Sequence, residues 1–318
     1  MSSPSARSHP GPVILCAGIA VIDHVFAVDQ FPRPGTKTRA NAFLSTVGGG
    51  AANAAVAIAR LAGRVKLAAA LGGPLGVDSI GDEILAHLTR EGVDCSSVTR
   101  VGGAMSSISA IFIDASGERM IVNHRDSKLT QARAAVPDAL VRDIGVVLID
   151  NRFPEFVLPI AQAAQRRGLA VLLDADEPTQ RTNALLSACS HVIFSAEGLR
   201  AIGECDELPE ALKRVAARTD AFLAVTDGAN DILWLETDRL RRLPAFGIKA
   251  VDTLAAGDVF HGAFALALGE GSDVANAMRF AAAAAALKCS RFGGISGAPS
   301  RAEVEDFLIA RQVGKTSC

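Results

Sequence analysis

One aspartate, Asp258, follows three small residues at the start of a long apolar stretch. The sequence VDTLAAGDVFHGAFALAL places it directly after Ala255, Ala256 and Gly257. One interpretation is structural, because aspartate is a good helix N-cap and an N-cap needs no chemistry. The other interpretation is chemical: small residues let a backbone approach a phosphate, and the carboxylate handles a proton. The rest of the chain has to decide between them.

A second glycine-rich stretch, VGGGAANAAVAIARLAG, occupies residues 47–63. It allows three interpretations: a dinucleotide-binding fingerprint, glycines that only cap a helix, or a loop whose amides and Asn53 bind a hydroxylated ligand. The fingerprint is disfavoured, because Asn53 stands at its last glycine position and the following strand offers no acidic residue for a ribose. A dehydrogenase is therefore only a third option for the function.

The sequence has no Walker A loop for a nucleoside triphosphate. Its GK[ST] match at residues 314–316 lacks the earlier glycine and a following helix. Successive backbone amides from Leu254 to Asp258, at a helix N-terminus, would form another anion site. Such a site would stabilise the charge on a transferring phosphoryl group, where most of the catalysis of that reaction lies.

Strands and helices alternate along most of the chain. Short runs that are apolar on both faces predict buried parallel strands at residues 13–19, 65–71, 146–150, 170–176, 191–196 and 222–228. Helical patterns lie between or after them, at residues 51–63, 80–92, 156–168, 207–219 and 274–289. This order predicts a doubly wound α/β sheet, in which ligands bind beyond the carboxyl ends of the strands.

Two segments, residues 24–47 and 106–124, do not fit this alternation. The first alternates with period two between turn residues, and the second predicts a β-hairpin around the turn ASGE. Together they predict a small sheet that projects from the core, as a lid over the strand ends, as a dimer contact, or as both. We expect one domain over residues 13–312, between a disordered tail at 1–12 and a short tail at 313–318.

Composition excludes several classes of partner. The chain has 318 residues, a formal net charge of −2 and a pI near 6.3, which argues against a nucleic-acid or anionic-membrane surface. Six scattered cysteines without a CxxC spacing indicate reduced thiols in the cytoplasm. The N-terminus mimics a short signal peptide, but we interpret it as a tail before a buried strand. No apolar run reaches the roughly 20 residues that span a bilayer.

Two motifs carry a family resemblance. DTLAAGDVFHGAF resembles the C-terminal signature of the ribokinase-like (PfkB) carbohydrate kinases, and VGGGAANAAVAIARLAG resembles their N-terminal signature. The two occur in the right order, and the similarity covers residues 13–312. The resemblance implies a Rossmann-type three-layer α/β/α sandwich with a small β lid. It also implies ATP as phosphoryl donor, Mg²⁺, a sugar as acceptor and a homodimer formed through the lid.

The resemblance implies roles for the residues that match these motifs. Asp258 matches the catalytic base, and the anion hole matches Ala255, Ala256 and Gly257. The residues implied to bind sugar hydroxyls are Asp23, Gly49, Gly50 and Asn53. Position 255 departs from the common glycine, although the backbone amide of Ala255 remains.

The nucleotide and ion sites depart further from the family pattern. Thr226 and Gly228 match a nucleotide-binding turn, whose second glycine is replaced by an aspartate, and Lys288 opens a loop expected on the adenine side. Asp252 lies near the position where many relatives organise a monovalent cation such as K⁺. Glu197 matches the residue implied to organise Mg²⁺, but the asparagine that should stand three residues before it is missing.

Three further polar residues point to the substrate. Lys37, Asn123 and Arg152 are similar to the residues that are implied to bind the sugar sulfonate in the sulfofructose kinase branch of the family. An arginine after the strand VVLID can grip an anion through two hydrogen bonds. The alternative is a surface salt bridge from Arg152 to Glu155 or Asp176.

We therefore expect an ATP-dependent kinase that phosphorylates a primary hydroxyl, at carbon 1 of a ketose such as 6-deoxy-6-sulfofructose. Fructose, 2-keto-3-deoxygluconate, ribose or a nucleoside are alternative acceptors. An alternative of another class is a non-catalytic sugar or nucleotide sensor. The presence of Asp258, the residue that matches the catalytic base, argues against a sensor. Near a helix N-terminus, Asp258 is expected to be ionised at neutral pH and to be only a weak base. His261, one helical turn later, is either structural or close enough to support the site.

Overall fold

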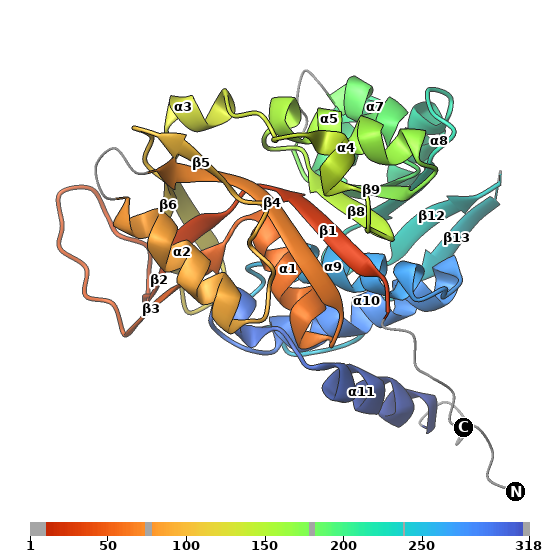
Figure 1. Cartoon of the computed structure of the whole chain (residues 1–318). Helices are drawn as coiled ribbons and strands as arrows, with labels where there is room; N and C mark the ends of the chain where they lie inside the picture. The colour runs from red at the N-terminus through yellow and green to blue at the C-terminus, as the bar shows by residue number, and fades with distance from the viewer. Residues whose placement is uncertain (1–10, 74–77, 178–181, 238, 314–318) are drawn as a thin grey trace, which may run out of the picture.

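The computed structural model describes residues 11–73, 78–177, 182–237 and 239–313 (Figure 1). Most of the two predicted tails, and the GK[ST] match at 314–316, lie outside the described residues. Residue 313, which was expected to begin the C-terminal tail, ends helix α11 (Arg301–Val313). The first strand, β1, begins at Val13, as the apolar pattern predicts.

A large sheet forms the centre of the molecule. Among the described residues it has nine strands in the order β13-β12-β11-β10-β9-β8-β1-β4-β5. The six predicted strands are all present, as β1 (Val13–Gly18), β4 (Arg64–Gly73), β8 (Val146–Asp150), β9 (Ala170–Ala175), β10 (His191–Ser195) and β11 (Phe222–Thr226). Three strands were not predicted, namely the two edge strands β5 (Thr99–Gly102) and β13 (Arg239–Leu243), and β12 (Ile232–Glu236), which lies next to β13. β12 pairs antiparallel with both β11 and β13, and the other pairs of the sheet are parallel.

Helices cover both faces of this sheet, which confirms the predicted three layers (Figure 1). One layer contains α1 (Gly50–Arg60), α2 (Ser79–Arg90), α9 (Ala256–Gly269), α10 (Val274–Cys289) and α11. The opposite layer contains α5 (Pro154–Arg166), α6 (Thr182–Ala188), α7 (Ala196–Gly203) and α8 (Leu208–Ala216). Side chains of β1 alternate between the two cores and are fully buried on both sides, which explains its unbroken apolar sequence.

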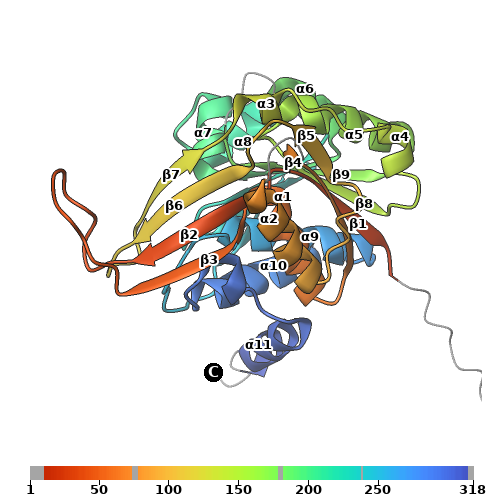
Figure 2. The same cartoon turned by 60° about the vertical axis from the view of Figure 1, so that its left-hand side comes forward.

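The two predicted insertions do pair in a small second sheet, which we call the lid (Figure 2). Its order is β3-β2-β6-β7, with the strands β3 (Ala42–Gly48), β2 (Val21–Ala27), β6 (Ser107–Ile113) and β7 (Arg119–His124). Strand β2 begins three residues before the predicted insertion at residue 24. The loop at residues 28–41 projects from the outer end of the lid (Figure 2).

The strand order explains where a ligand site can form. β1 pairs with β4 on one side and with β8 on the other, so the chain reverses its direction of winding there. In such sheets the loops that leave neighbouring strands diverge and open a crevice at the carboxyl ends. The loops after β1 and β8, and the N-terminus of α1, meet at this crevice. The short helices α3 (Ser127–Thr130) and α4 (Pro137–Leu140) lie in the connection between the lid and β8.

Candidate active site

Asp258 lies in the first turn of α9, three residues after an N-cap residue in left-handed conformation. Ala255, the N-cap, has φ 64°, so the backbone turns sharply before the helix begins. The amides of Ala255, Gly257 and Asp258 have no acceptor within the described part of the chain. The amide of Leu254 donates to Asp252. The amide of Ala256 donates to the carbonyl oxygen of Thr253. Two of the five amides expected to bind an anion are therefore used inside the protein, and the other three remain available to a ligand.

The carboxylate of Asp258 is held by Asn53. Asn53 Nδ2 donates to Asp258 Oδ2 over 2.7 Å, which joins the two glycine-rich motifs in one site. Asn53 Oδ1 is buried and has no hydrogen-bond partner among the described residues, so it offers an acceptor to a ligand hydroxyl.

The ionisation of Asp258 differs from the expectation. Burial, followed by the nearby negative charge of Asp174, raises the pKa of Asp258 from 3.8 to about 7. These effects outweigh Asn53 and the helix N-terminus, which favour the charged form. Asp258 is thus a stronger base than the helix position alone predicts, and its pKa lies in the range that suits a general base.

His261 packs beneath Asp258 within the same helix. Its Nδ1 lies 2.7 Å from the carbonyl oxygen of Gly257 and 3.4 Å from Asp174 Oδ2, and its Nε2 lies 3.3 Å from the carbonyl oxygen of Ile193. Burial lowers the pKa of His261. The imidazole therefore ties the start of α9 to β9 and β10, and this position supports the site from below.

Asp150, at the end of β8, was not singled out from the sequence. Its buried carboxylate accepts the amides of Ile19 at 2.8 Å, Ala51 at 3.1 Å and Arg152 at 3.0 Å. A side chain at Gly18 would lie within 2.1 Å of this carboxylate. Asp150 thus fixes the loop after β1 against the start of α1. The sequence signal that could have identified Asp150 is its position as the charged last residue of the apolar strand β8.

Polar side chains cross the lid in one row on the face that carries Asp23. The register pairs Thr46, Asp23, Ser109 and Asn123 on β3, β2, β6 and β7. Asn123 Nδ2 donates to Ser109 Oγ over 3.2 Å. Burial raises the pKa of Asp23 to about 6, although Ser109 opposes this shift through a hydrogen bond. A row of carboxyl, hydroxyl and amide groups is suited to bind the hydroxyls of a sugar.

The absence of side chains at three glycines leaves space for the Asp23 carboxylate and for the close approach of the start of α1 to its neighbours. A Cβ at Gly48 would lie 1.9 Å from Asp23 Oδ2. Gly49 has φ 92°, and a Cβ there would lie 2.7 Å from the carbonyl oxygen of Ile19. Gly50 begins α1 beside Asp150, and a Cβ there would lie 3.2 Å from Asp150 Oδ2. The glycine cluster is therefore required for close backbone approach.

The three residues expected to bind a sulfonate lie on three different segments, namely the projecting loop, β7 and the turn after β8. Arg152 forms ion pairs with Asp176 and Glu177. Of the two salt-bridge partners suggested from the sequence, Asp176 is therefore in contact with Arg152. Asn123 lies in the polar row, whereas Lys37 is exposed in the projecting loop.

Another cation, Arg125, lies beside Arg152 and was not predicted. Its guanidinium stacks on the ring of Phe153 at 5.0 Å, and its buried Nε has no partner among the described residues. No acceptor or ion-pair partner of Arg125 occurs in that part of the chain. Burial, followed by the charge of Arg152, lowers the pKa of Arg125. The charges of Asp150 and Glu177 oppose this shift, and a cation whose Nε has no partner among the described residues is suited to an anionic ligand.

The expected nucleotide residues lie at the ends of neighbouring strands. Thr226 ends β11 and pairs with Ser195, the last residue of β10. Gly228 has φ 55° and lies in an exposed turn. Glu197 is an exposed carboxylate in the first turn of α7, directly after β10. Lys288 is fully buried in the last turn of α10, so the structure does not place its side chain where a nucleotide would contact it.

The carboxylates near the expected nucleotide site could hold Mg²⁺ only together with the phosphates of a bound nucleotide. Among the described residues there is no group of three His, Cys, Asp or Glu side chains that could hold a metal ion. Mg²⁺ commonly takes one or two carboxylates and completes its shell with substrate phosphates and water. Glu197 and Asp176 supply carboxylates at neighbouring strand ends, which fits that arrangement.

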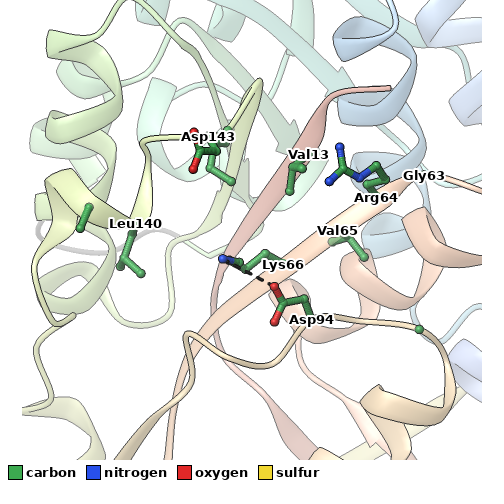
Figure 3. A pocket seen from close by; sticks show the side chains of 11 residues that line it. Val13, Gly63, Arg64, Val65, Lys66, Asp94, Leu140 and Asp143 are labelled. Atoms are coloured by element: carbon green, nitrogen blue, oxygen red, sulfur yellow. Dashed lines mark ion pairs between the residues drawn. The ribbon is translucent and has the colours of Figure 1, made fainter. Parts of the chain in front are cut away.

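A hollow elsewhere in the molecule does not contribute to this site (Figure 3). It lies at the amino ends of β1 and β4, where Val13 and Val65 line it and Lys66 pairs with Asp94 over 3.5 Å. Asp258, Asp23 and Asp150 lie at the opposite edge of the sheet, beyond the carboxyl ends of the strands.

Comparison with known proteins agrees with this geometry. The model of the pfkB family of carbohydrate kinases matches residues 13–301. The ribokinase of Haemophilus influenzae is 30% identical over 90% of this chain and 95% of its own length. A provisionally assigned ribokinase of Agrobacterium tumefaciens has a solved structure that superimposes with a TM-score of 0.91 and is 36% identical, over 95% of this chain and 99% of its own. The ATP-bound fructokinase structure from Xylella fastidiosa is 25% identical, with a TM-score of 0.78 over 94% and 99% of the two chains.

The chain therefore belongs to the pfkB family of carbohydrate kinases. The expected fold and the expected enzyme class, an ATP-dependent sugar kinase, are both confirmed. In the described ranges, no helix combines the length and apolar character needed to cross a membrane.

Proposed function

We propose that the protein transfers the γ-phosphate of ATP to a primary hydroxyl of a small sugar, with Asp258 as the general base. The observation that supports this role is the juxtaposition of the Asp258 carboxylate, with its raised pKa, and three free amides at the start of α9. The amides of Ala255, Gly257 and Asp258 would stabilise the charge on the phosphoryl group. Asp258 would take the proton of the attacking hydroxyl as the new oxygen–phosphorus bond forms.

The sugar is held, in this proposal, between the lid and the sheet. Asp23, Ser109 and Asn123 would bind its hydroxyls from the lid, and Asn53 Oδ1 from α1. Thr226 and Gly228 would contact the nucleotide at the ends of the neighbouring strands. Mg²⁺, held by Glu197 and the phosphates, would supply positive charge that screens the transferring group.

The acceptor proposed first is a ketose with a distal acidic group, phosphorylated at carbon 1, such as 6-deoxy-6-sulfofructose. Arg125 beside Arg152 supports an anionic substituent, because its half-buried guanidinium, whose Nε has no hydrogen-bond partner among the described residues, can bind a ligand anion. A second candidate is ribose, which is supported by the full-length similarity to ribokinases of Haemophilus influenzae and Bacillus subtilis.

A panel of sugars with and without an acidic group tests this choice. For an acidic ketose, Arg125→Gln is expected to lower kcat/KM by about 10–150-fold, since a hydrogen bond to a charged group contributes about 1.5–3 kcal/mol. Neutral sugars should be affected little. The matched control is Arg39→Gln, because Arg39 is exposed in the projecting loop. ADP release is the measurement.

Two outcomes would count against the acidic ketose. Turnover of ribose alone by the unchanged protein would favour the second candidate. An equal loss for acidic and neutral sugars in Arg125→Gln would show that the residue acts on the structure and not on the anion.

The lid also supports a proposed homodimer. On the face that does not carry Asp23, Phe26 lies 5.0 Å from Phe43 and 5.5 Å from Phe112, between ring centroids. Phe43 and Val122 are 57% and 62% exposed, which is unusual for large apolar side chains on a sheet. We expect sedimentation equilibrium to give a dimer that Phe43→Glu with Val122→Glu dissociates. A monomer of the unchanged protein at assay concentration would contradict this.

A further inference from the structure

The carboxylate of Asp252, expected near a monovalent cation, accepts hydrogen bonds from three backbone amides of the protein itself. Asp252 is buried, and its Oδ1 accepts the amide of Leu254 at 2.8 Å. Its Oδ2 accepts the amides of Gly293 at 3.0 Å and Gly294 at 2.8 Å. These contacts tie together the loop before α9 and the turn after α10.

The remaining contact of Asp252 is with the ammonium of Lys288. Lys288 Nζ lies 3.1 Å from Asp252 Oδ2 and donates to the carbonyl oxygen of Asp252 over 2.7 Å. The Lys288 side chain has no exposed surface. A carboxylate and a carbonyl oxygen of one residue thus bind one positive charge, as they would bind a monovalent ion. A metal ion at Asp252 would have to displace the ammonium or sit against it.

The pair is costly to bury unless both partners remain. Burial lowers the pKa of the Lys288 ammonium, and Asp252 opposes that shift. Removing one partner of a buried ion pair leaves the other charge uncompensated, which is strongly destabilising. The position of the ammonium in a fully packed site therefore indicates that its charge serves the loop that Asp252 organises.

We propose that the Lys288 ammonium is a built-in replacement for the monovalent cation, so that this kinase needs no K⁺. Lys288 acts as a positioning residue: it holds Asp252, which holds the Leu254 amide and so the loop whose free amides receive the phosphate. This inference rests on the proposed role of the amides of Ala255, Gly257 and Asp258. The residues present do not fit a separate K⁺ ion at Asp252.

The unchanged protein gives the first test. Activity and thermal stability are measured in potassium and in tetramethylammonium salts of equal ionic strength, since tetramethylammonium is too large for the site. We expect the same kcat/KM for ATP and the same Tm in both. A specific activation by K⁺, or a Tm that rises only with K⁺ as ligand linkage requires for a bound ion, would overturn the proposal.

A variant gives the second test. Lys288→Ala is expected to lower kcat/KM by about 100-fold in tetramethylammonium, because the anion loop loses its geometry. Potassium, ammonium or methylammonium ions should then restore part of the activity and raise the Tm. Lys213→Ala is the control, because Lys213 is exposed on α8. Full activity of Lys288→Ala without added cation would overturn the proposal, as would a folded variant that no cation rescues.

Two further arms keep the test decisive. If Lys288→Ala does not fold, the double variant Asp252→Asn with Lys288→Met removes both charges, and it should keep the fold but lose activity that K⁺ cannot restore. Restoration by K⁺ there would overturn the role of Asp252. If no sugar is phosphorylated, the proposed function fails, whereas the salt-dependent Tm still decides whether Lys288 replaces the ion.

Discussion

Asp258→Asn is expected to lower kcat by about 10²–10⁴-fold, the usual contribution of a positioned general base. The substitution keeps the shape of the side chain, and its amide oxygen can still accept the hydrogen bond that Asn53 Nδ2 donates to Asp258. ATP binding should therefore persist, as equilibrium titration with a fluorescent nucleotide would measure. Near-normal turnover would refute the role of Asp258.

The pH dependence supplies the control for this prediction. Because the base must be deprotonated, kcat/KM of the unchanged protein should rise with pH through about 7, the raised pKa of Asp258. The variant should lose that dependence, and a remaining change near 6 would belong to Asp23.

Stability should change in the opposite direction to activity. The pKa of Asp258 is about 7 in the folded protein against 3.8 as the ordinary value, so the folded state holds the proton more tightly and loses stability as pH rises between these values. A neutral amide avoids that loss. The Tm of Asp258→Asn should exceed that of the unchanged protein above pH 7 and approach it at acidic pH.

Gly257→Ala is expected to lower kcat/KM for ATP by about 100-fold, because a displacement of the phosphate by about 1 Å suffices for such a loss. A Cβ at Gly257 would meet nothing within 4 Å in the protein, so the added methyl group would fill space that the proposed phosphate needs. Gly257 lies inside α9 with an ordinary φ, where alanine is favoured over glycine by about 0.5–1 kcal/mol. The free energy of unfolding should therefore rise slightly.

Gly247→Ala is the matched control for this substitution. Gly247 also has open space around its Cα and lies in an exposed loop. The control should change neither the free energy of unfolding nor kcat/KM appreciably. Unchanged kinetics of Gly257→Ala would show that the phosphate does not approach this residue, and a loss of stability would show that the substitution acts on the fold.

Much of the large sheet was predictable because its strands are buried on both faces. That burial forces unbroken apolar runs such as VILCAG of β1 and VVLID of β8. The antiparallel strands β12 and β13 were missed, and the edge strand β13 has no apolar run to reveal it, since its sequence is RLRRL and it is mostly exposed. Local alternation revealed the lid strands, but the parallel pairing of β2 with β6 depends on contacts that are distant in the sequence.

The site was less predictable where contacts between distant segments decide the outcome. The helix position of Asp258 favours a low pKa, but burial and Asp174, from a different strand, raise it. Lys288 lies in the last turn of an alanine-rich helix, where the sequence suggested the start of a loop on the adenine side of the nucleotide. Its buried pairing with Asp252, 36 positions earlier, arises only when the two segments pack together. The motifs identified Asp258 as the candidate base, whereas its pKa and the pairing of Lys288 depend on the tertiary structure.

A single-turnover measurement with Asp258 present or replaced tests most directly whether this residue is the base of a sugar kinase. Protein preloaded with ATP and Mg²⁺ is mixed with the sugar selected by the panel, and sugar phosphate and ADP are followed together. We expect equal amounts of both products from the unchanged protein, whereas Asp258→Asn should hardly consume its bound ATP. Equal rates of sugar phosphate formation by the two proteins, or bound ATP that the unchanged protein never transfers, would contradict it.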